Sequence, residues 1–167
     1  MREAVFVSYA RTGMAKAARG GSVRSSFHTT ICVLEGLLEY ERSYGFDASI
    51  TQARATGEEY LLQRHLIRRR SNGGLIDQEW TYFAFPPLWH YDILRALDYL
   101  RASGRPRDER LEEALGLVAH RRMPDGRWSR EVVHADTLCE EFAGAPGAPS
   151  RWITLRAMRV THWFRLG

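Results

Sequence analysis

An internal repeat constrains this sequence more than any other feature. Three ten-residue peptides, which begin at His28, His90 and Trp152, align without gaps at a constant spacing of 62 residues. Apolar residues recur in each peptide at intervals of three and four positions, which is typical of a helix that buries one face. The repeat therefore predicts three apolar helices, at residues 27–42, 89–102 and 152–164.

A second series of matches lies between these helices. Peptides 66–76 and 118–128 align at a spacing of 52 residues, each with two arginines at the end of a helical pattern and a glycine, Gly74 or Gly126, in the turn that follows. The polar helical patterns that these turns close cover residues 51–69 and 108–121. The repeating unit is therefore a helical hairpin that cannot bury its apolar face alone and must stack on a neighbour.

The second turn and the apolar helices resemble one known family. Arg122, Gly126 and Trp128 match the repeat turn of the squalene and hopene cyclases, Gln-x-x-x-Gly-x-Trp, with arginine in place of glutamine. The peptide SRWITLRAMRV resembles the first turns of an inner helix of that family, and FPPLWHYDILRALDYL is similar to a segment of bacterial squalene-cyclase-like proteins. The family, which includes the protein prenyltransferase β subunits, forms rings of helical hairpins whose inner helices line an apolar cavity.

The resemblance implies an all-α fold, a partial α/α toroid built of helical hairpin repeats. We expect this domain to cover residues 25–167, and no alternating pattern indicates a strand. Three inner helices make about half of a closed ring, so one apolar edge should be open. The N-terminal segment 1–24 could then be the tail of a preceding hairpin, and the chain could be a piece of a longer toroid.

The residues that perform chemistry in this family are missing. The sequence has no Asp-x-Asp-Asp and no Asp-Asp-x-x-Asp motif, and Asp92 and Asp98 are isolated. The zinc ligands of the prenyltransferases do not all map onto the chain. We therefore predict a squalene-cyclase-like helical module without cyclase chemistry or a cofactor. Its concave face would bind an apolar or isoprenoid ligand, a peptide or a partner.

Asp92 is the one candidate catalytic residue, and it has two interpretations. If it faced a closed apolar cavity, desolvation would raise its pKa, and it could act as the acid of an isoprenoid-type cyclase or transferase. Alternatively, its carboxylate stabilises the first turn of its helix. Thr30 and Thr154 stand at the equivalent repeat positions and can make similar local bonds, which favours the second interpretation.

Aromatic and histidine side chains at the starts of the apolar helices are the candidates for lining a cavity. They are His28, Trp89, His90, Tyr91 and Trp152. Aromatic rings of this kind stabilise cations, but core packing also explains them. No close-spaced ligand pair accompanies the two histidines or the group His134, Asp136 and Cys139, so we predict no metal site.

The net charge of +4 and the run Arg68-Arg69-Arg70 raise a third alternative, a basic nucleic-acid-binding repeat. Paired arginines end the other polar helix as well, which favours a structural role at helix ends, so we do not expect nucleic-acid binding. No apolar run is long enough to span a membrane, and no secretion signal is evident, so we expect a cytoplasmic protein.

The last apolar helix ends with two large aromatic residues, Trp163 and Phe164, and no polar helix follows them. A stack of hairpins normally ends in a polar cap. We therefore expect these two side chains to be exposed and to form an interface, either in a homodimer or with a missing toroid segment.

Overall fold

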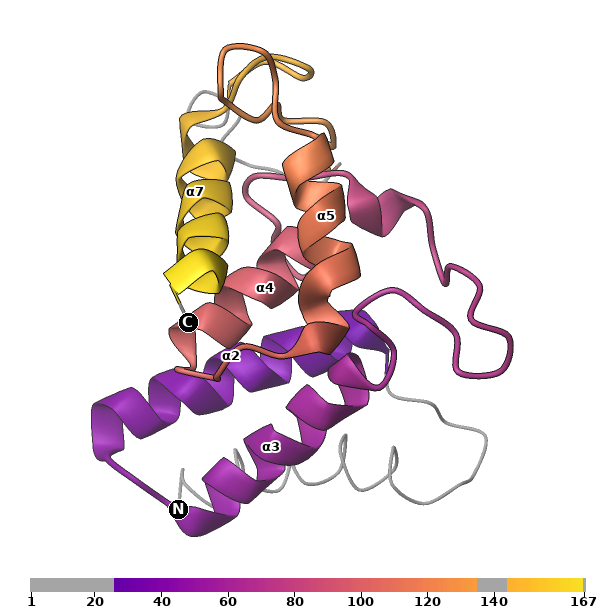
Figure 1. The fold of residues 1–167 in the computed structure, drawn as a ribbon. Helices are drawn as coiled ribbons and strands as arrows, with labels where there is room; N and C mark the ends of the chain where they lie inside the picture. The colour runs from indigo at the N-terminus through magenta and orange to yellow at the C-terminus, as the bar shows by residue number, and fades with distance from the viewer. Residues whose placement is uncertain (1–25, 135–143, 167) are drawn as a thin grey trace. The chain divides into compact units, whose positions relative to one another are not determined.

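The computed structural model describes residues 26–134 and 144–166 of the chain. These residues form α-helices and two short 3-10 helices, connected by loops that carry isolated β-bridges but no strand. The helices are α2 (Phe27–Tyr44), α3 (Ala48–Leu62), η1 (Glu79–Thr81), α4 (Ile93–Ala102), η2 (Glu109–Leu111), α5 (Glu112–His120) and α7 (Arg151–Leu166) (Figure 1). The prediction of a mostly helical fold is confirmed.

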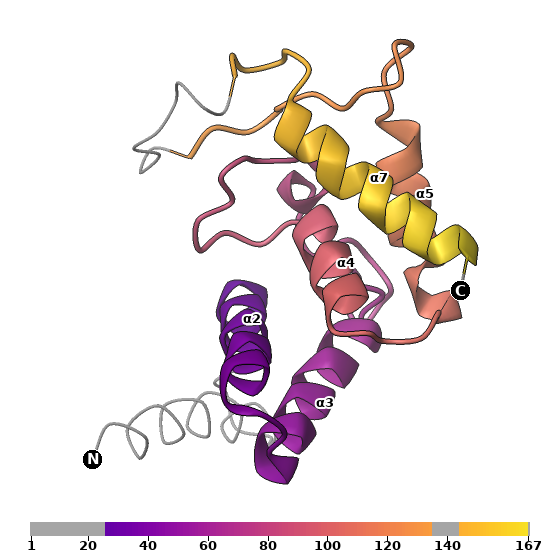
Figure 2. The same cartoon turned by 90° about the vertical axis from the view of Figure 1, so that its left-hand side faces the viewer.

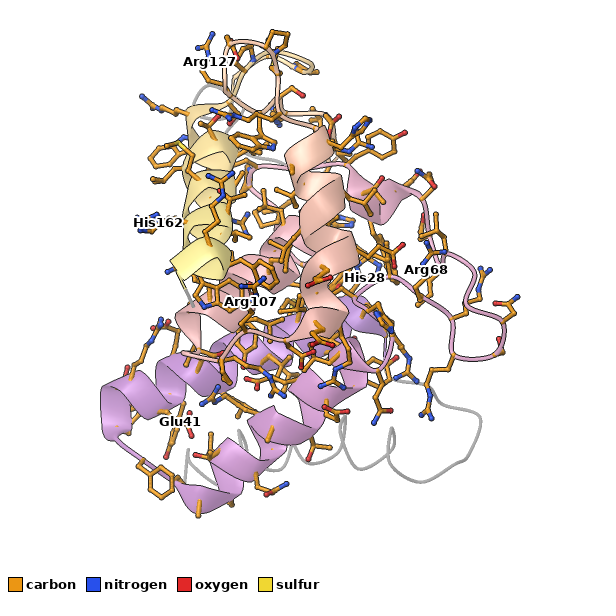
Figure 3. All side chains as sticks on the ribbon, viewed as in Figure 1. His28, Glu41, Arg68, Arg107, Arg127 and His162 are labelled. Atoms are coloured by element: carbon orange, nitrogen blue, oxygen red, sulfur yellow. The ribbon has the colours of Figure 1, made fainter. Side chains whose placement is uncertain are left out.

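The chain divides into two compact units, Met1–Leu61 and Leu62–Gly167. In the first unit, α2 and α3 form a helical hairpin. Leu37 and Ile50 are buried together between the two helices. Glu41 lies on the side of α2 that faces α3, where its carboxylate accepts hydrogen bonds from Thr51 and from Arg54 Nε at 2.6 Å (Figure 3). The rings of Phe27 and Tyr60 lie 5.5 Å apart between the same helices, so the hairpin is joined by several apolar contacts and by a partly buried polar contact.

In the second unit, α4 packs against both α5 and α7 (Figures 1 and 2). The helix α4 is buried on most sides, and its apolar residues meet the predicted faces of the other two helices. The buried apolar residues of the three helices are Ile93, Leu94, Ala96, Leu97 and Leu100 in α4, Ala114, Leu115 and Val118 in α5, and Ile153, Ala157 and Val160 in α7. The apolar residues that recur at intervals of three and four positions in these helices are thus buried in one core.

The start of α4 differs from the prediction. The helix begins at Ile93 and not at Trp89, since Leu88 has a φ of +49°, outside the right-handed helical region. Asp92 therefore occupies the N-cap, the residue just before the first helical turn.

The other two apolar helices start one turn earlier in the repeat. Thr30 and Thr154 lie inside the first turns of α2 and α7, where their amides donate to the carbonyls of Ser26 and Ser150. Ser26 caps α2, and the Ser150 hydroxyl accepts from the Ile153 amide. The expected equivalence of Asp92 with the two threonines is therefore wrong, because Asp92 precedes the first turn of its helix whereas the threonines lie within theirs.

The polar helices are shorter than predicted. The helix α3 ends at Leu62 instead of continuing to residue 69, because His65 and Leu66 adopt φ values of +45° and +65°. The predicted helix 108–121 is divided into η2 and α5. Asp108 caps η2 by accepting a hydrogen bond from the Arg110 amide.

The loops next to α4, α5 and α7 are joined by backbone contacts. Isolated β-bridges connect Ala84 with Val132 and Ser129 with Pro149. Trp128 is 3% exposed and links two helices: its Nε1 donates to Val118 O of α5 at 2.7 Å, and its amide donates to the Thr154 hydroxyl of α7 at 3.0 Å. Trp128 therefore links the end of α5, through its indole, to the start of α7, through its backbone amide.

Candidate functional site

An open groove of about 810 Å³ lies in the second unit. Its walls come from η1 and the residue after it, from the segment before α4, and from the segment 131–134. The lining residues are Glu79, Tyr82, Trp89, His90, Glu131, Val132, Val133 and His134. This volume is in the range of small-molecule sites, and the walls combine aromatic, aliphatic and acidic side chains.

Three stacked rings form one part of the groove. The rings of Trp89 and His90 lie 3.8 Å apart, and those of His90 and His134 lie 3.5 Å apart and almost parallel, at 7°. Trp89 is 54% exposed, so its ring remains accessible. The turn at Leu88 leaves Trp89 and His90 ahead of the helix, and this places both side chains in the groove wall.

A second part of the groove is polar and carries negative charge. The Arg121 guanidinium lies 3.9 Å from the centre of the Tyr82 ring and forms an ion pair with Glu131. The other carboxylate oxygen of Glu131 accepts from the Phe83 amide at 3.3 Å. Glu79 adds an exposed carboxylate. The groove thus presents aromatic faces beside two carboxylates, of which Glu131 has an arginine partner.

Asp92 does not line this groove. Its carboxylate is 4% exposed and accepts a hydrogen bond from the Arg95 amide at 2.7 Å, as an N-cap residue does. Burial raises the pKa of this carboxyl, while the positive charge of Arg156 and the Arg95 amide oppose the increase. The structure thus gives Asp92 the helix-capping role of the second interpretation, together with the raised pKa that the first requires.

The other predicted lining residues have separate places. Tyr91 is buried, and its hydroxyl donates to Leu66 O at 2.8 Å. Trp152 is half-buried and stacks on Phe85, with 5.4 Å between ring centres. His28 is a half-buried residue of α2 in the first unit. Of the predicted set, Trp89 and His90 line the groove.

The metal alternatives receive no geometric support within the described ranges. No group of three potential ligands lies close enough together there to hold a metal ion. His134 contacts His90 by ring stacking, whereas Asp136 and Cys139 lie outside the residues that the structure describes.

The arginine run, of which Figure 3 labels Arg68, lies outside the groove lining, and its side chains contact neighbouring parts of the chain. Arg68 Nε donates to Glu113 at 2.9 Å, and its Nη1 donates to Gly73 O at 3.0 Å. Arg69 donates to the Ile76 carbonyl. Arg70 donates to the side chain of Gln63. These contacts fit the structural interpretation, in which the arginines stabilise the turn after α3.

Five groove residues were missed in the sequence: Glu79, Tyr82, Glu131, Val132 and Val133. None belongs to the repeat, and Glu131 to Val133 follow the Gly126 turn in a stretch without helical periodicity. The one sequence feature that marks these residues is the density of aromatic and β-branched side chains around η1 and after Trp128. Without the fold, this feature is too weak to predict a groove.

The exposed patch expected at Trp163 and Phe164 is wrong in detail. Both side chains are half-buried, and the Arg107 guanidinium lies over the Phe164 ring at 4.3 Å. The exposed apolar residues of α7 are instead Leu155 and Met158, at 41% and 56% exposure. Assembly through this helix stays a prediction.

Comparison of the chain with protein-family models, with curated proteins and with solved structures found no match. The resemblance to the squalene and hopene cyclases therefore stays a prediction from the sequence. Within the described ranges, no helix has the length and apolar character that crossing a membrane requires.

Proposed function

We propose that this chain is a helical binding module, built like part of an α/α toroid, that holds an apolar ligand without transforming it. The observation that carries the proposal is the groove beside Trp89, an accessible aromatic surface in a hollow of about 810 Å³. Apolar walls with a few placed polar groups are the usual composition of a small-molecule site. The missing acidic motifs support binding without turnover.

The charges of the groove select among apolar ligands. Glu79 and Glu131 supply two carboxylates, and Arg121 neutralises the second. A diphosphate group placed there would meet like charge, whereas an uncharged alcohol would not. The favoured ligand is therefore an uncharged isoprenoid-like molecule. The same repulsion disfavours nucleic acid in this groove.

Equilibrium dialysis of the purified chain with farnesol and with farnesyl diphosphate tests this proposal. We expect saturable binding of farnesol and weaker binding of the diphosphate. Trp89→Ala should weaken farnesol binding about tenfold, since it removes an aromatic contact equivalent to about 1.4 kcal/mol. Phe46→Ala is the matched control, because Phe46 is 82% exposed and lies outside the groove. Equal weakening by both substitutions, or tighter binding of the diphosphate, contradicts the proposal.

An isoprenoid enzyme with Asp92 as acid is the second candidate, because burial raises the pKa of this carboxyl. Incubation with squalene and with prenyl diphosphates, followed by product analysis, separates the two functions. Turnover that Asp92→Asn abolishes and Asp98→Asn retains would establish the enzyme. Asparagine caps a helix as well as aspartate does, so loss of the N-cap would not confuse the result.

A further inference from the structure

The two carboxylates of the groove differ in the contacts that they already make. Both oxygens of Glu131 are occupied: one forms the ion pair with Arg121, and the other accepts from the Phe83 amide at 3.3 Å. Glu79 is exposed, and its carboxylate forms no hydrogen bond or ion pair with the described residues. Of the two groove carboxylates, Glu79 is therefore the one that is left to contact a ligand.

The backbone of Glu79 is held on both sides. Its amide donates to the Asp77 carboxylate at 2.9 Å, and its carbonyl accepts from the Tyr82 amide at 3.0 Å. The next two residues of η1 are buried, with Trp80 8% exposed and Thr81 1% exposed. Glu79 thus directs an exposed side chain from a turn whose other two residues belong to the core.

The two buried residues anchor η1 to its surroundings. The Trp80 ring meets the Tyr91 ring edge-on, with 4.9 Å between their centres, and η1 packs against α4. The Thr81 hydroxyl accepts from Arg121 Nη2 at 3.2 Å and donates to Gln78 O at 2.9 Å. A binding group on a fixed backbone loses less conformational freedom when a ligand arrives. The turn that carries the uncommitted carboxylate is therefore suited to binding.

An ionised carboxylate accepts hydrogen bonds and donates none, so it selects a ligand group that donates. A hydroxyl group donates, whereas a hydrocarbon chain or an ether does not. We propose that Glu79 is the specificity-determining residue of the groove and accepts a hydrogen bond from the hydroxyl group of an alcohol. Trp89, Val132 and Val133 then contact the apolar part of the same molecule. This role of Glu79 rests on the proposed function, because it concerns the ligand of the same groove.

Equilibrium dialysis with farnesol and with farnesyl methyl ether tests this role, because methylation removes the donor and leaves the apolar chain unchanged. The ratio of the two dissociation constants measures the preference for the alcohol. Glu79→Ala should reduce this preference about fivefold, the ratio equivalent to a hydrogen bond of about 1 kcal/mol, and should leave the affinity for the ether nearly unchanged. Glu79→Gln should retain part of the preference, because the amide oxygen still accepts.

Glu109→Ala is the matched control for the lost carboxylate. Glu109 is also exposed and also begins a 3-10 helix, η2, but it lies outside the groove. Its replacement should leave the preference for the alcohol as it is in the unaltered protein. A loss of preference in Glu109→Ala as large as that in Glu79→Ala would overturn the role of Glu79.

Trp89→Ala separates the failure of this role from the failure of the proposed function. It should weaken the binding of the alcohol and of the ether by the same factor, because the ring contacts the apolar chain that both contain. If both ligands bind through Trp89 but Glu79→Ala keeps the full preference for farnesol, the role of Glu79 is overturned and the proposed function stands. If neither ligand shows saturable binding, or if Trp89→Ala has no effect, both are overturned.

Discussion

Two turns in the second unit, at residues 67–76 and 119–128, occupy equivalent places in the repeat but are held in different ways. In the first turn, Arg68 forms a salt bridge with Glu113 whose side chains are both 35% exposed. In the second, the buried indole of Trp128 donates to Val118 O of α5, and the backbone amide of Trp128 donates to the Thr154 hydroxyl of α7. Exposed ion pairs contribute little to stability, whereas buried aromatic side chains contribute several kcal/mol. The second turn should therefore be the stronger structural element.

The largest expected difference concerns the residues that end the two turns. Trp128→Ala should lower the free energy of unfolding by about 3–5 kcal/mol, because it leaves a cavity and removes the bond to Val118. Ile76→Ala, at the equivalent position, should lower it by about 1 kcal/mol, because Ile76 is half-buried. Urea unfolding followed by circular dichroism measures both. Equal losses would mean that the turns are energetically alike.

The glycines of the two turns provide the next test. Gly126 has a φ of +84°. Its structural counterpart Gly73 also has a positive φ, of +67°, whereas Gly74, which aligns with Gly126 in the sequence, does not. Replacement by alanine should cost about 1–2 kcal/mol at Gly126 and Gly73 because of left-handed backbone strain. At Gly74 the new methyl group meets only the Asn72 side chain, at 3.2 Å, and the cost should be smaller. A Gly74→Ala loss as large as that of Gly126→Ala would contradict this pairing.

A smaller effect tests the contact between the second turn and α7. Thr154→Val removes the hydroxyl that accepts from the Trp128 amide and should cost about 1 kcal/mol, because that amide loses its partner. Thr161→Val is the control, since the Thr161 hydroxyl donates only within α7, to Ala157 and Met158. Chemical denaturation of the two variants should give clearly different midpoints. Similar midpoints would show that the Thr154 contact does not stabilise the turn.

The smallest effect belongs to the salt bridge of the first turn. Glu113→Gln should cost about 0–1 kcal/mol at neutral pH, and less in high salt. Arg68 lowers the pKa of Glu113 in the folded state. The stabilisation is therefore fully present above the unfolded pKa of about 4.5 and is lost progressively as the pH falls through the lower, folded-state pKa. Denaturation of the protein and of Glu113→Gln at pH 7 and pH 3 should show a smaller difference between the two at pH 3. Glu112→Gln, an exposed neighbour, should show no such convergence.

The sequence predicts the helical faces well, because the intervals between Ile93, Leu97 and Leu100 depend only on helix geometry. It does not predict where helices begin and end. His65, Leu66 and Leu88 adopt positive φ values and interrupt helices at positions where the helical pattern of apolar residues in the sequence continues. Side chains of this kind rarely adopt positive φ, and the surrounding structure imposes it here. The helical content could therefore be predicted from the sequence, while the ends of the helices could not.

The groove could be predicted only in part. His90 stands out because it begins a repeat peptide, and Trp89 precedes it, but the contact of His90 with His134 joins segments that lie far apart in the sequence. Spacing within one helix contains no information about such a contact. The alignment of the two glycines also failed to predict the backbone conformation. Gly74 aligns with Gly126 in the sequence, but Gly73 is the residue that shares its positive φ.

The bridge between Ser129 and Pro149, with the bond from the Arg130 amide to Ala148 O, has a consequence for how such a chain can evolve. The connection from 130 to 148 leaves and returns at one place, so its length is uncoupled from the position of α7. In general, doubling the number of residues between two fixed anchors adds only about 0.6 kcal/mol to the entropic cost of closure. Insertions between residues 130 and 148 should therefore be tolerated, and related chains should differ most in length there.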